Sequence, residues 1–174
     1  MNVPQAPMSP EQAARNRRII VLVTAVFVAS CIGVTVWARM VVKGAQAEAR
    51  LTDSALRSAA WAILCYADAN DGSFPTSDAA LRAGGPGRAP AGGKPWPSSV
   101  DAALGGLPAM DAGEALARIG VTWGPTADVV PNINSKGRPA TVGTVDAVNG
   151  WLAEYARDRS RSGGTPKEQR SDSK

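Results

Sequence analysis

A run of uncharged, mostly apolar residues from Ile19 to Ala38 constrains the fold of this chain more than any other feature. It reads IIVLVTAVFVASCIGVTVWA and contains no Asp, Glu, Lys or Arg. As an α-helix, a segment of this length measures about 30 Å, which matches the hydrocarbon core of a bilayer. We therefore predict a membrane-spanning helix over residues 19–38, with anchoring side chains that include Ile19, Val23, Phe27, Ile32 and Trp37.

Basic residues flank the predicted span on both sides. Their count does not decide its orientation, because three lie on each side within about fifteen residues: Arg15, Arg17 and Arg18 before it, and Arg39, Lys43 and Arg50 after it. The first three form the more compact cluster and lie directly at the boundary. We therefore expect residues 1–18 to be a cytoplasmic tail. The part of the chain after the span is then expected to lie outside the cytoplasmic (inner) membrane.

Two other interpretations of the apolar run remain open. Val28-Ala29-Ser30-Cys31 resembles a bacterial lipobox, in which the cysteine becomes a lipidated N-terminus. The residues after Cys31 stay apolar, however, whereas lipoproteins usually turn polar there. Val36-Trp37-Ala38 fits the pattern of a signal-peptidase site, although the apolar region before it is unusually long for a signal peptide. We rank an uncleaved single-pass anchor first, a lipoprotein second and a secreted protein third.

The helix is expected to continue beyond the span, because residues 39–71 are mostly good helix formers. One apolar stripe at helical spacing runs along this amphipathic stalk, and it consists of Leu56, Ala60, Ile63, Leu64 and Ala67. The charged residues of the stalk keep mainly off the stripe; these are Arg50, Asp53, Arg57 and Asp68. The stripe strengthens toward residue 69. We therefore expect the end of the stalk to pack on a folded domain and its beginning to be bare.

The stalk helix is expected to end in the segment Asn70-Asp71-Gly72-Ser73-Phe74-Pro75. Gly72 suits the left-handed backbone position just past a helix, and Pro75 prevents the helix from resuming. Phe74 is expected to fold back on the last turn. Asp68, Asn70 and Asp71 are weak candidates for calcium ligands, but Gly72 comes one position early for an EF-hand loop. We expect a capped, solvated turn that holds no metal.

The membrane helix, its amphipathic continuation and the segment from Tyr66 to Pro75 together resemble type IV pilins and the pseudopilins of type II secretion systems. The sequence is most similar to G-like pseudopilins, whose helix ends in a Tyr followed by an Asp/Asn-Gly-x-Phe/Tyr-Pro turn. The resemblance covers residues 1–76. It implies a pilin-like α+β fold, in which the long N-terminal helix packs on a small antiparallel sheet. It also implies a structural role in a secretion or pilus-type assembly for protein transport, with membrane lipid and neighbouring helices of the same or other subunits as partners.

Two features depart from that family. Arg17-Arg18-Ile19-Ile20 stands where a prepilin-peptidase site would lie. The apolar run also lacks the early glutamate that, in the family, pairs with the N-terminal amine of a neighbouring subunit. The sequence therefore indicates a pilin-shaped protein that stays in the membrane.

Residues 72–160 are expected to form a small extracytoplasmic α+β domain. Three helices are expected: a short one at 77–82, one that runs from a capping box at Asp111 and Glu114 to Ile119, and one over 145–158. A strand is expected at 121–123. A hairpin is expected to pair 128–130 with 140–142 around a turn at 135–138. We assign the stripe on the last helix to the core: Val145, Val148, Trp151, Leu152 and Tyr155.

Two segments of this half of the chain are expected to lack regular structure. Residues 83–99 form a Gly/Pro-rich loop, in which Trp96 either docks on the domain or presents an adhesive surface. Residues 161–174 form a polar tail that is expected to be disordered.

Several function classes are excluded or disfavoured by composition. The chain has no histidine among its 174 residues, which excludes Ser-His-Asp and Cys-His catalysis and histidine metal sites. The carboxylates are scattered, and the Gly-rich segment is not placed between a strand and a helix, so no catalytic pair or phosphate loop is indicated. We expect neither enzyme activity nor a cofactor, a small-molecule substrate or a nucleic-acid partner. The alternative function is a binding module, anchored or lipidated at Cys31, whose loop contacts cell wall, carbohydrate or a secreted protein.

The two cysteines are not expected to bond to each other. Cys31 and Cys65 would lie roughly 50 Å apart along one helix, which is far beyond the reach of a disulfide. Cys65 is expected to be a packed free thiol, and an intermolecular disulfide remains the second interpretation.

Overall fold

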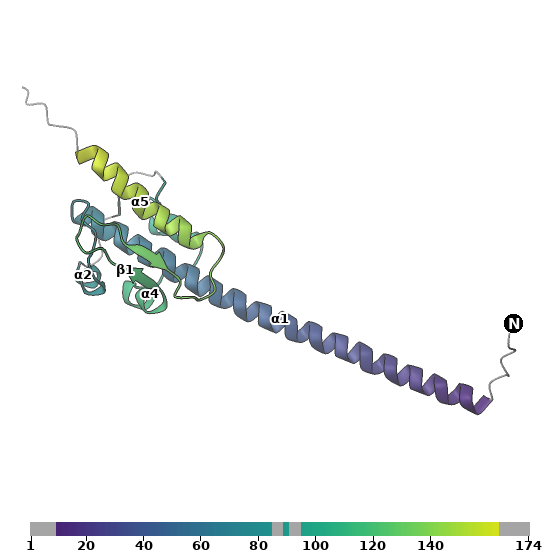
Figure 1. Ribbon diagram of the computed structural model, residues 1–174. Helices are drawn as coiled ribbons and strands as arrows, with labels where there is room; N and C mark the ends of the chain where they lie inside the picture. Colours follow the sequence, from purple (N-terminus) through teal and green to yellow (C-terminus); the bar gives the residue numbers. More distant parts are fainter. Residues whose placement is uncertain (1–9, 85–88, 91–94, 164–174) are drawn as a thin grey trace, which may run out of the picture. The chain divides into compact units, whose positions relative to one another are not determined.

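A computed structural model describes residues 10–84, 89–90 and 95–163 of the chain (Figure 1). Its longest element is α1, a helix of 60 residues from Pro10 to Ala69. The expectation that residues 19–69 form one helix is therefore confirmed. The helix also includes residues 10–18, which precede the apolar run. The first helical residue is a proline, which is well suited to this position because its missing N–H has no partner there. The chain divides into two compact units, residues 1–45 and 46–174, so α1 contributes to both.

The second unit is an α+β domain built around the C-terminal part of α1. Figure 1 shows α5 beside this part of α1, with the shorter elements gathered around the same part. After α1 the elements are α2 (Asp78–Ala83), α3 (Val100–Leu104), α4 (Ala112–Arg118), β1 (Gly120–Thr122), β2 (Asn132–Asn134) and α5 (Thr144–Gly163). The expected α+β class, with a long apolar N-terminal helix and a small antiparallel sheet, is confirmed at this level.

The sheet joins a different pair of segments from the one expected. β1 and β2 are antiparallel, and Val121 stands opposite Ile133. A strand near 121–123 is therefore confirmed, whereas the hairpin of 128–130 with 140–142 is wrong. The missed strand has only one apolar residue, Ile133, which is fully buried between two exposed asparagines. Such a short pattern gives little periodic signal.

A side chain from α5 completes the edge of β2. Asn149 Oδ1 accepts a hydrogen bond from the Ile133 N–H at 2.8 Å, and Asn149 Nδ2 donates to the Ile133 carbonyl at 2.8 Å. The amide of one side chain therefore replaces a neighbouring strand, which explains how a two-stranded sheet is stabilised without a third strand. The expected turn at 135–138 is present, since Arg138 N donates to Ser135 O at 3.0 Å, but it leads out of β2 instead of joining two paired strands.

The short helices begin at side-chain caps. Asp111 Oδ1 accepts from the backbone N–H groups of Gly113 and Glu114, so the expected start of α4 is confirmed. Ser77 caps α2 in the same way, at the position expected for a short helix. Sequence reasoning missed α3, which lies just past the Gly/Pro-rich segment. Its N-cap is Ser99, and it ends at a left-handed Gly105.

The last helix is longer than expected. α5 continues to Gly163, whereas the sequence predicted an end near Asp158 and disorder from residue 161. Polar side chains support the extra turn, because Arg157 pairs with Glu154 at 2.6 Å and the Ser160 and Ser162 hydroxyls donate to backbone carbonyls one turn earlier. The prediction of disorder is thus wrong for residues 161–163, and residues 164–174 lie outside the described part of the chain.

The domain encloses α1 on more than one face. The stripe residues Leu56, Ala60, Ile63, Leu64 and Ala67 are all fully buried. Polar residues of the same helix are buried as well: Thr52, Asp53, Ser54 and Ser58. Asp53, which was expected to keep off the packed face, accepts a hydrogen bond from Thr141 N at 2.9 Å. Small side chains at Ala55 and Ala59 allow chain segments to approach the helix closely, and Ser58 Oγ accepts from Met110 N at 3.1 Å.

Candidate functional site

The apolar part of α1 is exposed throughout the first unit. An 18-residue window of this helix has a mean hydropathy of 2.7, and none of it is buried. The predicted anchoring residues are 52–67% exposed: Ile19, Val23, Phe27, Ile32 and Trp37. Soluble proteins rarely leave so large a continuous apolar surface uncovered. Among the residues that the structure describes, α1 is the one helix long and apolar enough to cross a membrane.

Polar side chains within the apolar run are satisfied by the helix itself. The Ser30 hydroxyl donates to the Val26 carbonyl at 2.9 Å, and the Thr35 hydroxyl donates to the Cys31 carbonyl at 2.7 Å. Each bond spans four residues of the same helix. Hydroxyl groups paired in this way add little cost in a medium without water.

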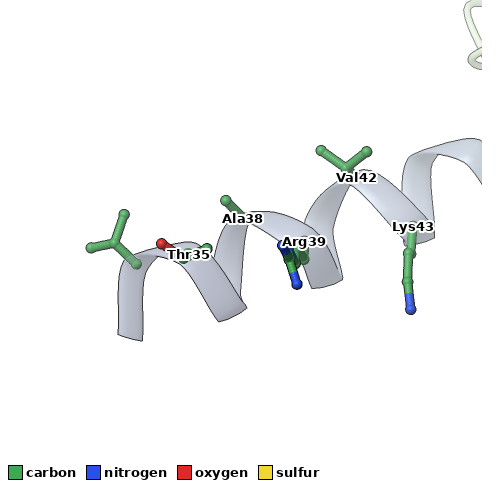
Figure 2. A pocket seen from close by; sticks show the side chains of 6 residues that line it. Thr35, Ala38, Arg39, Val42 and Lys43 are labelled. Carbon is green, nitrogen blue, oxygen red and sulfur yellow. The ribbon is translucent and has the colours of Figure 1, made fainter. Parts of the chain in front are cut away.

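The run is followed by two cations on one side of the helix. Figure 2 shows Arg39 and Lys43 one turn apart, while Ala38 and Val42 project to another side. Both cationic side chains are exposed. Trp37 lies just before them, which is a position typical of the aromatic residues at the ends of membrane helices.

The turn after α1 closes the helix and starts the domain. Gly72 has a φ of 92°, and its N–H donates to the Ala67 carbonyl at 2.7 Å. This left-handed position favours glycine. Phe74 is buried and lies edge-on to the ring of Tyr155, with the ring centroids 6.2 Å apart, and Pro75 beside it is fully buried. Phe74 thus packs against α5.

Two of the three weak candidates for metal ligands, Asp68 and Asn70, have other partners. Asp68 Oδ1 accepts from Arg159 Nη2 at 2.7 Å and from the Tyr155 hydroxyl at 3.3 Å. Asn70 Nδ2 donates to the Tyr66 carbonyl at 2.8 Å, and Asp71 is exposed on the turn. Burial raises the pKa of Tyr155, so the phenol stays protonated and donates to the carboxylate. Over the described residues, no three His, Cys, Asp or Glu side chains gather as a metal site would require.

Polar contacts that the sequence did not reveal hold the start of the domain. Glu48 Oε1 accepts from Arg118 Nη2 at 2.7 Å and from Arg138 Nη1 at 3.0 Å. Arg57 donates to the Ala103 carbonyl at 3.0 Å and lies over the ring of Trp151. These partners are tens of residues apart in the chain, and sequence spacing carries no signal for such pairs.

Trp96 docks on the domain, which decides between its two expected positions. It is 6% exposed and lies edge-on to Tyr155, with ring centroids 5.5 Å apart. The indole therefore belongs to the core and is not an adhesive surface residue. Residues 85–88 and 91–94 of the Gly/Pro-rich segment lie outside the described part of the chain.

The thiol of Cys65 is expected to react slowly. Burial, with a smaller contribution from the charge of Asp68, raises the pKa of Cys65 from 9.0 to about 11. Near pH 8 the thiolate fraction is then roughly a hundredfold smaller than in the unfolded chain, and only the thiolate is nucleophilic. In a Cys31→Ser variant, a thiol reagent should label Cys65 at least a hundredfold more slowly before denaturation than after it.

The same measurement across pH tests the direction of the shift. The folded state keeps the Cys65 thiol protonated to a higher pH than an ordinary thiol. Because the thiolate fraction grows tenfold per pH unit below the pKa, the labelling rate should rise about tenfold per pH unit up to about pH 11. A Cys31→Ser protein that is labelled equally fast folded and unfolded would show that Cys65 is accessible and unperturbed.

Comparison of the chain with models of protein families, with curated proteins and with solved structures finds no match.

Proposed function

We propose that this protein is a membrane-anchored structural subunit of pilin or pseudopilin type in a secretion or pilus-type assembly. One observation carries the proposal: a single helix, α1, combines an apolar segment that is exposed throughout with a C-terminal part that forms the centre of a small α+β domain. The exposed segment suits lipid and neighbouring helices, and the domain is what such a subunit presents outside the bilayer. The protein acts through packing and needs no catalytic group.

The residues at the end of α1 support the same proposal. In the resembling family a Tyr, a Gly and a Phe/Tyr-Pro pair close the helix, and here Gly72 is left-handed while Phe74 and Pro75 are buried. The N-terminus then lies in the cytoplasm and the domain lies outside the inner membrane. The absence of a prepilin cleavage site in the sequence indicates that the anchor is retained.

Association within the bilayer would use the small residues on one face of α1. Ala25, Ala29 and Gly33 recur at four-residue spacing, which allows helix backbones to approach closely. A Cβ atom added at Gly33 meets no atom within 4 Å apart from the adjacent residues and the backbone of its own helix. A side chain there is therefore expected to disturb neighbouring helices more than the packing of the subunit itself.

Gly33→Ile should weaken association between membrane-embedded subunits by about tenfold or more, because the larger side chain separates the backbones. Crosslinking of the full-length protein in intact membranes, or energy transfer between two labelled copies, measures the effect. Val34→Ile adds bulk at the next position and is the matched control, expected to associate as the wild type does. Equal association of both variants would exclude this face from assembly.

The lipoprotein and secreted alternatives differ from the anchor in mass. Intact-mass measurement of the protein purified from membranes should give a chain that begins at or near Met1. A lipidated chain that begins at Cys31 would instead support the binding module, and a chain that begins at Arg39 would support secretion.

A further inference from the structure

Arg39 and Lys43 are two cations without a carboxylate to neutralise them. The sequence contains no Asp or Glu between Glu11 and Glu48. Both side chains are exposed, and neither takes part in an ion pair between residues of the described chain. By contrast, Glu48 beyond them already pairs with Arg118 and Arg138. The countercharge for Arg39 and Lys43 must therefore come from outside this segment.

A neighbouring side of the helix, next to the two cations, is apolar. Figure 2 shows the strip formed by Val34, Thr35, Ala38, Arg39, Val42 and Lys43. The Thr35 hydroxyl is already bonded to the Cys31 carbonyl, so it offers no hydrogen of its own to a ligand. The strip thus begins at the uncharged residues Val34 and Thr35, and its two cations lie in its later turns, with Ala38 and Val42 on a neighbouring side of the helix.

We propose that this strip, residues 34–43, binds an anionic phospholipid, whose phosphate lies between Arg39 and Lys43 and whose acyl chain runs along Val34 and Ala38. The proposal rests on the proposed membrane anchor, because it requires the apolar run to lie in a bilayer. Arg offers a planar set of N–H donors and Lys a compact ammonium, and both are suited to phosphate oxygens. The first turn of the strip carries no charge and both cations lie beyond it, as the acyl chain and headgroup of a phospholipid would require.

A phospholipid accounts for both halves of the strip, whereas a soluble anion would use the cations alone. Each cation near a membrane surface favours anionic lipid by roughly fivefold. Two cations on the same side of the helix should therefore enrich anionic lipid next to Trp37 by up to about 25-fold. Trp37 lies two residues before Arg39 and is 67% exposed, so its fluorescence reports on the lipid beside it.

The test uses the full-length protein in vesicles of phosphatidylcholine with a minority of phosphatidylglycerol. Two preparations have the same composition, and an equal amount of lipid is brominated in each: the phosphatidylglycerol in one, and part of the phosphatidylcholine in the other. Bromine quenches nearby tryptophan. The signal of Trp37 is obtained by subtracting the emission of a Trp37→Phe variant, which removes the contribution of the tryptophans in the domain.

Brominated phosphatidylglycerol should quench Trp37 several-fold more than brominated phosphatidylcholine does. The excess should disappear in an Arg39→Gln/Lys43→Gln variant and persist in an Arg15→Gln/Arg17→Gln control, whose changes lie at the other end of the run. Equal quenching by both lipids in the wild type would overturn the lipid site while leaving the anchor intact. No quenching by either lipid would overturn the anchor and the lipid site together.

Discussion

Removal of residues 1–39 is expected to transfer the protein from the membrane fraction to the soluble fraction without unfolding its domain. The deleted segment contains the exposed apolar run. The buried core, in contrast, begins at Thr52 and lies wholly in the second compact unit, residues 46–174. The hydrophobic driving force for membrane association is thus removed, while the buried area that stabilises the domain is kept. We also expect the shortened protein to be monomeric and to lose its partners.

Fractionation of cells, followed by thermal unfolding of the soluble product, measures both parts of this result. Deletion of residues 1–9 is the matched control, because it shortens the N-terminus and leaves the apolar run in place; that protein should stay in the membrane. A protein without residues 1–39 that still sediments with membranes, or that recovers the same partners as the full chain, would contradict assembly through the membrane helix.

Leu56→Ala is expected to lower the free energy of unfolding by about 2–5 kcal/mol, the range for a leucine removed from a packed core. Leu56 is fully buried at the centre of the domain. The same substitution at Leu51, five positions earlier in the same helix and 38% exposed, should cost only about 1 kcal/mol, because more than a third of this side chain is already in contact with solvent. The two variants have the same change of side chain and nearly the same helix propensity.

Denaturant unfolding of both variants in mild detergent, followed by the fluorescence of the domain tryptophans, gives the comparison. A large difference in the unfolding midpoint shows that the domain is built around the C-terminal part of α1. Equal destabilisation by Leu51→Ala and Leu56→Ala would mean that the helix is packed in a different rotation, and the core described above would be wrong.

Helical elements with strong periodic or capping signals could be predicted from the sequence. The stripe from Leu56 to Ala67, the Asp111 cap and the apolar positions of α5 are all local patterns, within a few residues of one another. The pairing of β1 with β2 was missed, because it joins segments through Ile133 and the side chain of Asn149, and neither has a local signature. Trp96 illustrates the same limit, since its position depends on Tyr155, tens of residues away.

The candidate site divides in a similar way. The exposed apolar run and the two cations after it were evident from residue order alone, because membrane anchoring depends on composition over a continuous segment. The partners of the candidate metal ligands could not be predicted from the sequence. The structure places Arg159 and Tyr155 against Asp68. Asp53 was expected only to keep off the apolar stripe, and the structure shows that it is buried and accepts a hydrogen bond from the backbone N–H of Thr141.

Residue order is enough to predict one long helix with an apolar first half, because helix propensity and hydropathy act between near neighbours. What surrounds the second half of that helix became known from the folded domain. Burial of Asp53, Trp96 and Ile133 depends on contacts between segments far apart in the chain. Those contacts form, and stabilise the domain, only when it folds around the C-terminal part of α1.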